Sequence, residues 1–136
     1  MKKSFSPTLL AAFAILILQV VDVLAKPICG IEFQSPEQVE AVLSVDKKLP
    51  AKNDDPMFAT YFDEASSIAW AFSSKLNPSY PTIVCRQIVV KNGTYNIDMD
   101  IRCGSTQESC DELSAAFNEL NQKTIETMKA NVKPKQ

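Results

Sequence analysis

The chain has 136 residues and a formal net charge of -2, and it contains four cysteines, three glycines and no histidine. Without histidine it cannot form a Ser-His-Asp or Cys-His catalytic pair, and zinc sites with an imidazole ligand are excluded. The glycines are scattered, which excludes a glycine-rich phosphate-binding loop. A chain of this length forms one domain at most, and we expect it to need no metal and no cofactor.

The first 25 residues have the pattern of a secretory signal peptide. Two lysines precede an unbroken apolar run over residues 9–18, and small side chains fit a cleavage site after Ala25. The run is shorter than the roughly 20 residues that span a membrane, and an uncleaved anchor is the alternative. We therefore predict a signal peptide over 1–25 and one secreted domain over 26–136, with a frayed tail at 130–136 and no insertion into the membrane. Because residues 1–25 hold two lysines and one aspartate, the secreted domain has a net charge of -3, which disfavours nucleic acid as a partner.

All four cysteines, Cys29, Cys85, Cys103 and Cys110, lie in the predicted secreted domain. An even number of cysteines in a small secreted domain is typical of disulfide bonds. A metal site is the alternative, but the chain has no Cys-x-x-Cys pair to support it. We therefore expect two disulfides, for which three pairings exist.

A first helix is predicted over residues 36–49. Ser35 can cap it, Pro36 suits the first helical position, and Gln38 completes a capping box. Pro50 ends it, because proline cannot continue a helix.

A longer helix is predicted over residues 56–76, opened by Asp55 and Pro56. Apolar side chains recur through this segment at steps of three and four residues, as in an amphipathic helix. They are Phe58, Tyr61, Phe62, Ala65, Ile68, Ala69, Phe72 and Leu76. We expect this helix to lie at the centre of the fold and to pack on a sheet. The alternatives are an aromatic ligand pocket and a helix on a membrane surface.

A β-hairpin is predicted over residues 82–103. Asn92 and Gly93 are the preferred centre of a two-residue type I′ turn, because both positions need a positive φ. That turn fixes the register of the two strands and gives one face that is apolar apart from Arg86. The pairs on this face are Val90–Tyr95, Ile88–Ile97, Arg86–Met99 and Val84–Ile101. The other face is polar and is expected to face solvent.

The register also favours one disulfide pairing. Cys85 and Cys103 point to opposite faces of the hairpin and are therefore poor partners, whereas Cys103 and Cys110 close a short loop. We expect Cys103–Cys110 and Cys29–Cys85. A third strand over residues 28–33 would then lie beside the hairpin.

A last helix is predicted over residues 110–129, where Ser109 and Glu112 form a second capping box. The elements together predict an α+β fold. A small antiparallel sheet of two or three strands packs on the long central helix, which is flanked by the other two helices.

Two further groups of polar residues could carry chemistry. Asp98 and Asp100 lie two apart on the polar strand face and could act in acid–base catalysis or bind Ca²⁺ if they lined a cleft. The alternative is a solvated strand face. Asn92 begins an Asn-Gly-Thr sequon at the hairpin turn and is a candidate glycosylation site.

The segment from Gln87 to Gly93, followed by Tyr95 and the Cys103 to Cys110 loop, resembles part of the secreted cystatins. Those inhibitors carry a Gln-x-Val-x-Gly hairpin that enters the cleft of a cysteine protease together with a glycine near the N-terminus. The resemblance implies a protease-contacting site at Gly30, Gln87, Val89 and Gly93.

The combined observations predict a small secreted, non-enzymatic binding protein that acts on another extracellular protein, as an effector or an inhibitor. Two alternatives stay open. One is a cystatin-like inhibitor of cysteine proteases, and the other is a carrier of a small apolar ligand held by the aromatic side chains of residues 56–76.

Overall fold

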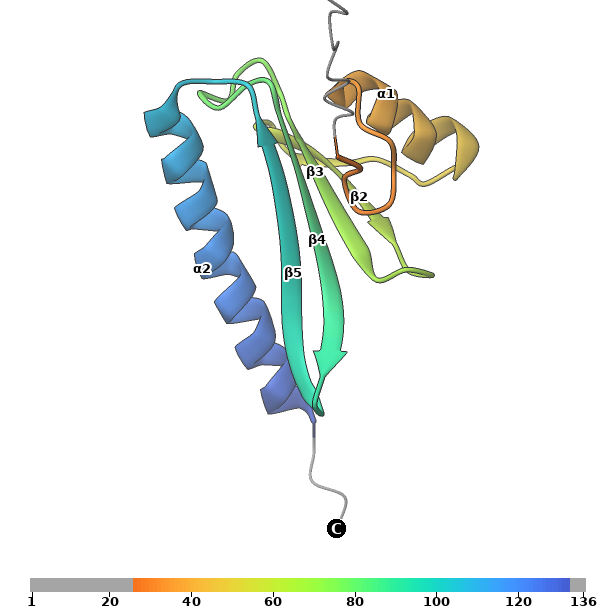
Figure 1. Cartoon of the computed structure of the whole chain (residues 1–136), viewed down its shortest axis with the longest axis vertical. Coiled ribbons are helices and arrows are strands. Elements are labelled where there is room, and N and C mark those ends of the chain that lie inside the picture. The colour runs from red at the N-terminus through yellow and green to blue at the C-terminus, as the bar shows by residue number, and fades with distance from the viewer. Residues whose placement is uncertain (1–25, 133–136) are drawn as a thin grey trace, which may run out of the picture.

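The computed structural model describes residues 26–132, which form three layers: a five-stranded sheet with one helix on each face (Figure 1). All strand pairs are antiparallel, and the strands lie in chain order from β1 to β5. The elements are α1 (Pro36–Ala41), the π-helical turn η1 (Val42–Asp46), β1 (Lys52–Asp55), β2 (Phe58–Asp63), β3 (Ile68–Ser73), β4 (Thr82–Lys91), β5 (Thr94–Cys103) and α2 (Gln107–Asn131).

The predicted hairpin is confirmed as β4 and β5. Their register runs from Lys91 opposite Thr94 to Thr82 opposite Cys103, and it reproduces every predicted pair. Asn92 and Gly93 have φ of 53° and 72°, as the tight turn requires.

The prediction of a long central helix over residues 56–76 is wrong. This segment forms β2 and β3, joined by a turn in which the Asp63 carboxylate accepts a hydrogen bond from the N–H of Ala65 at 3.1 Å. The sheet is covered on both faces at β2 and β3, so most successive positions of these two strands are apolar and the usual alternation is lost. The apolar spacing that remains resembles that of a helix. The expected sheet of two or three strands packed on a central helix is therefore replaced by five strands between two helices.

The expected third strand over residues 28–33 is also wrong. The segment makes a tight turn in which Ile28 and Ile31 exchange backbone hydrogen bonds of 2.9 Å. Cys29 and Gly30 at its centre have φ of 44° and 81°, so the chain reverses there and does not extend.

Both predicted disulfides are confirmed. Cys29 pairs with Cys85 and ties the N-terminal turn to β4, with 6.4 Å between their Cα atoms. Cys103 pairs with Cys110 and ties the end of β5 to the first turn of α2. Disulfides persist in oxidising compartments, so these two bonds indicate an oxidising environment for the chain.

The first predicted helix forms, but it is shorter than expected. The Ser35 hydroxyl accepts a hydrogen bond from the N–H of Gln38 at 3.3 Å, which confirms the cap. The helical backbone extends through α1 and η1 to Asp46 and does not reach residue 49.

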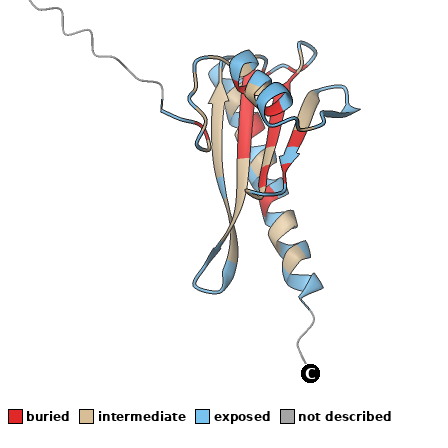
Figure 2. Cartoon of the chain, turned by 90° about the vertical axis from the view of Figure 1, so that its right-hand side faces the viewer, coloured by how far each residue is buried: buried red, intermediate tan, exposed pale blue. Residues whose placement is uncertain are grey.

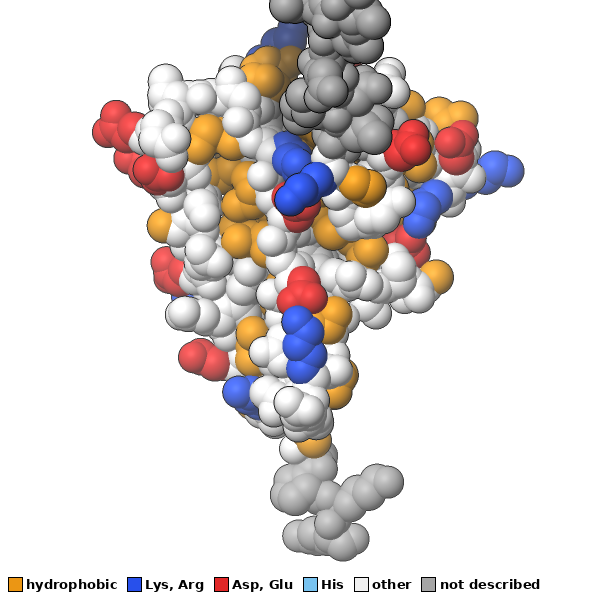
Figure 3. All heavy atoms as spheres, viewed as in Figure 1, with side chains coloured by type: hydrophobic (Ala, Val, Ile, Leu, Met, Phe, Trp, Pro, Cys, Tyr) orange, Lys and Arg blue, Asp and Glu red, His pale blue; other side chains and the backbone are white. Residues whose placement is uncertain are grey.

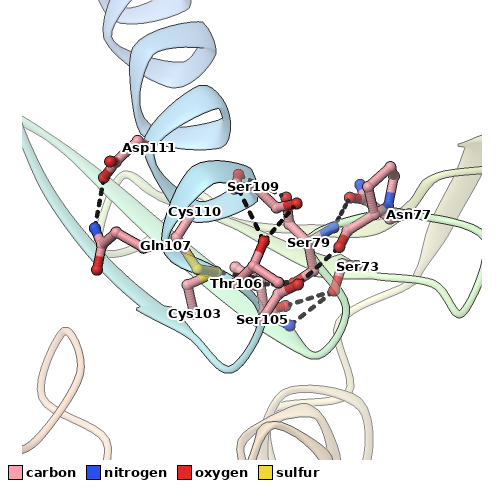
Figure 4. Close-up of a disulfide and its surroundings, with 12 residues drawn as sticks. Ser73, Asn77, Ser79, Cys103, Ser105, Thr106, Gln107, Ser109, Cys110 and Asp111 are labelled. Atoms are coloured by element: carbon pink, nitrogen blue, oxygen red, sulfur yellow. Dashed lines mark hydrogen bonds between the residues drawn. A yellow bond between two sulfur atoms is a disulfide. The ribbon is translucent and has the colours of Figure 1, made fainter.

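The last helix begins one turn earlier than the predicted residue 110 and continues to Asn131. Its cap is Thr106, whose hydroxyl accepts a hydrogen bond from the N–H of Ser109 at 3.2 Å; Ser109 itself is not the cap. Figure 4 shows the Cys103–Cys110 disulfide beside this cap. The Ser79 hydroxyl also donates a 3.0 Å hydrogen bond to the carbonyl of Ser109, so the start of α2 is fixed to the loop before β4.

Two apolar clusters hold the layers together. The larger one lies between the sheet and the helical segment of α1 and η1, where Val39 of α1 and Leu43 of η1 are fully buried against β3 and β4. The smaller one lies between α2 and the opposite face, where Leu113 packs with Ala71 and Val84. Figure 2 shows the buried residues concentrated in the strands beneath α1, whereas the turn between β4 and β5 is exposed.

The predicted signal peptide and the last four residues of the predicted tail lie outside the described residues. Residues 130 and 131, which were expected to fray, belong to α2. Within the described part of the chain, neither helix combines the length and the hydrophobicity of a membrane-crossing segment.

Candidate ligand groove

A groove of about 470 Å³ separates α2 from the outer strands of the sheet. We call it the α2 groove, and its lining includes Phe58, Thr60, Phe62, Ala69, Arg86, Ala116 and Leu120. Its volume falls in the range of about 300–1,000 Å³ that is typical of small-molecule sites.

Short side chains create the space. Ala69 and Ala71 of β3 and Thr60 of β2 lie on the sheet face under α2, and Ala116 faces them from the helix. Larger side chains at these positions would fill the gap, as Leu113 and Val84 do closer to the start of α2. The groove is therefore encoded by a local change from large to small residues.

Aromatic and aliphatic side chains form the walls. The rings of Phe58 and Phe117 make an edge-to-face contact with centroids 5.8 Å apart, which joins β2 to α2. Phe62 and Leu120 border the groove and are each 44% exposed. Large apolar side chains in contact with water beside a concave surface are a common sign of a binding site.

Arg86 of β4 is a cation that lies among these apolar groove-lining side chains. Its Nε donates a 2.5 Å hydrogen bond to the Asn121 side chain, and its Nη2 donates one of 3.2 Å to the Thr124 hydroxyl. No carboxylate of residues 26–132 lies within ion-pair distance of its guanidinium. Partial burial lowers the pKa of Arg86, but a guanidinium stays charged in proteins. The groove thus holds a positive charge that the described residues do not neutralise.

A second cavity of about 200 Å³ shares Phe62, Ala69 and Arg86 with the α2 groove. Ile88 and Ile97 extend its lining along β4 and β5 beneath the later turns of α2. Arg86 therefore lies where the two apolar spaces meet. Figure 3 shows hydrophobic side chains gathered where α2 lies along the sheet.

The aromatic side chains expected to form a ligand pocket divide between the two faces. Phe58 and Phe62 point toward α2 and line the groove. The Tyr61 ring packs on Phe72 beneath α1, with centroids 5.7 Å apart. The aromatic spacing was therefore a poor indicator of the groove. A better indicator in the sequence was Arg86, the one charged residue on an otherwise apolar face of the predicted hairpin.

Two polar contacts fix α1 and η1 to β2 on the other face. The Tyr61 hydroxyl donates to the Glu40 carboxylate at 2.8 Å; burial and this neighbour raise the pKa of Tyr61 to about 12. Lys47 donates to the buried Asp63 at 2.7 Å, which lowers the pKa of that carboxyl. The Tyr61 hydroxyl and the Asp63 carboxylate therefore have structural partners on the α1 side of the sheet.

The four residues implied by the cystatin resemblance do not come together. Val89 and Gly93 lie in or beside the turn of the β4–β5 hairpin, and Gln87 contacts the carbonyl of Ser66 through its side chain at 3.4 Å. Gly30 is held next to Cys85 by the disulfide of Cys29. At about 3.3 Å per strand residue, that point is roughly 25 Å from Gly93.

The candidate carboxylates are both paired with cations. Asp98 accepts a hydrogen bond from Lys91 at 2.9 Å, and Asp100 accepts one from Arg102 at 2.9 Å. Within residues 26–132, no three metal-ligating side chains form a cluster. Asn92 is exposed at the hairpin turn, where a glycan would be accessible.

Comparison with known proteins gives no family assignment. No protein-family model matches the chain, and neither the curated proteins nor the solved structures include a match.

Proposed function

We propose that this chain is a small secreted, non-enzymatic binding protein that carries a small apolar ligand in the α2 groove. The observation that carries the proposal is the open space of about 470 Å³ between α2 and β2–β3, lined by apolar and aromatic side chains. A site of this size and character can enclose most of a small apolar molecule.

The exposed side chains at the groove support the same proposal. Phe62 and Leu120 each keep 44% of their surface in contact with water. Ligand burial would remove this apolar surface from water, at about 25 cal/mol per Å². The two disulfides and the predicted signal peptide are consistent with a carrier that works outside the cell.

The proposal is tested with a neutral fluorescent probe, N-phenyl-1-naphthylamine, titrated against the disulfide-bonded chain. We expect saturable binding with an increase in fluorescence. A116W places a large ring in the groove from an exposed helical position and is expected to abolish binding. A115W is the matched control, because Ala115 is exposed on the same turn and does not line the groove.

Both substitutions are on the surface of a helix and are expected to change stability by less than about 0.5 kcal/mol. Circular dichroism checks that both variants are folded. Equal loss of binding in A115W and A116W, or no binding to the unmodified chain, would contradict the proposal.

A second candidate function is docking to an extracellular protein through the β4–β5 hairpin, as a cystatin-like inhibitor would. The observation in its favour is the exposed turn, where Val90 is 64% exposed and residues 91–94 are all in contact with water. Figure 1 shows this end of the hairpin extending beyond β2 and β3. Titration against a papain-like protease tests it, and an absence of inhibition at micromolar concentration would exclude it.

A further inference from the structure

The α2 groove contains a charge that a purely apolar ligand would leave unused. Arg86 donates two hydrogen bonds to Asn121 and Thr124, and both acceptors are neutral. A guanidinium carries five N–H donors, so donors remain for another acceptor. Burying an unpaired charge is costly, and the apolar walls around Arg86 increase that cost.

We infer that the ligand of the α2 groove is an organic acid with one carboxylate and an apolar chain, and that Arg86 binds the carboxylate. This inference rests on the proposed function, since it specifies the ligand class of the same groove. The planar guanidinium matches the geometry of a carboxylate and can bind it through two parallel hydrogen bonds.

The charge of the groove lining favours a single negative charge on the ligand. Lys52 and Asp55 also border the groove, and their opposite charges cancel. Arg86 therefore sets a net lining charge of one positive unit. A dianionic head group, such as a phosphate monoester, carries more negative charge than this net lining charge would balance, because the second cation, Lys52, is offset by Asp55.

The position of Arg86 explains where the rest of the ligand would lie. The guanidinium borders both the α2 groove and the adjoining cavity of about 200 Å³. A chain attached to the carboxylate can extend over Ala69 toward Phe62, or over Ile88 beneath the later turns of α2. Both paths are largely apolar, which favours a hydrocarbon chain over a polar one.

The inference is tested by comparing 11-(dansylamino)undecanoic acid with its methyl ester in fluorescence titrations of the disulfide-bonded chain. The two probes differ in the charge of one end. We expect the acid to bind about tenfold more tightly than the ester, in line with one charge-assisted contact. In R86Q the acid should lose about tenfold in affinity while the ester changes by less than twofold. R86K keeps the charge but not the planar pair of donors, so it should retain only part of the preference.

Three results separate the possible failures. Equal binding of acid and ester to the unmodified chain would overturn the inference and leave the groove as an apolar site. Equal weakening of both probes in R86Q would show that Arg86 acts on the structure of the groove and not on the carboxylate, which also overturns it. If N-phenyl-1-naphthylamine and both dansyl probes fail to bind, the proposed function fails together with the inference.

Discussion

Removal of the two disulfides one at a time should reveal how differently they stabilise the chain. A disulfide acts largely by restricting the unfolded chain, and its effect grows with the length of the loop it closes. Cys29 and Cys85 are 56 residues apart, whereas Cys103 and Cys110 are 7 apart. The loop-entropy relation gives losses of about 4.2 and about 2.4 kcal/mol in the free energy of unfolding for C29A/C85A and C103A/C110A, respectively.

Urea unfolding followed by tryptophan fluorescence measures both losses. Trp70 is the one tryptophan of the chain and is 2% exposed, so its emission reports on the core beneath α1. With a urea slope of about 1.5 kcal/mol per M, the midpoint of C29A/C85A should lie about 1.2 M below that of C103A/C110A. Equal midpoints, or a lower midpoint for C103A/C110A, would refute the reasoning from loop length.

Three further substitutions test local features of the fold. Y61F removes the hydrogen bond to Glu40 and should cost about 1 kcal/mol. Because the folded pKa of Tyr61 is about 12, its contribution to stability is complete below pH 10 and is lost as the pH rises to about 12. The urea midpoint of the unmodified chain should therefore fall over this pH range by more than the midpoint of Y61F. D63N should cost about 1 kcal/mol at pH 7, and this cost should shrink as the pH is lowered into the acid range. The reason is that the pKa of Asp63 is lowered in the folded chain, so its contribution is lost as the pH falls through that folded pKa. T106A should lower the thermal midpoint, because it loses about 1 kcal/mol of capping energy. S109A should change the midpoint little, because it keeps the backbone N–H from which the Thr106 hydroxyl accepts its hydrogen bond. A larger effect of S109A than of T106A would show that Ser109 is the cap.

The hairpin was predictable because its signal is local. Asn92 and Gly93 specify one turn type, and that turn sets the register of both strands up to Cys103. The disulfide pairing followed from the register, since it placed Cys85 and Cys103 on opposite faces. Local stereochemistry therefore determined the part of the fold that was predicted correctly.

Residues 56–76 were misread because their environment is not local. Their strands are covered on one face by α1 and on the other by α2, and neither cover can be recognised from the segment itself. The turn between them carried a usable signal in Asp63, whose side chain bonds to the N–H of Ala65. The aromatic and branched residues around Trp70 also favour a strand.

The groove was only partly predictable for a similar reason. Its space depends on small side chains, Ala69 of β3 and Ala116 of α2, that become neighbours through packing of distant elements. Because residues 56–76 were predicted to form a helix, the prediction could not place Ala69 on the face of a sheet. Arg86 was visible as an exception in the apolar pattern, but its unpaired charge is a property of the folded chain.

The order of the strands has a consequence for the way this chain folds. Each strand of the sheet pairs with the one that precedes it, so closing the sheet needs only short loops, and proteins with such local contacts fold quickly. The N-terminal turn at Cys29 is the exception, because it must find Cys85 across 56 residues. We therefore expect strands β2 to β5 to assemble first. The Cys29–Cys85 disulfide should form later, when α1 packs on the sheet.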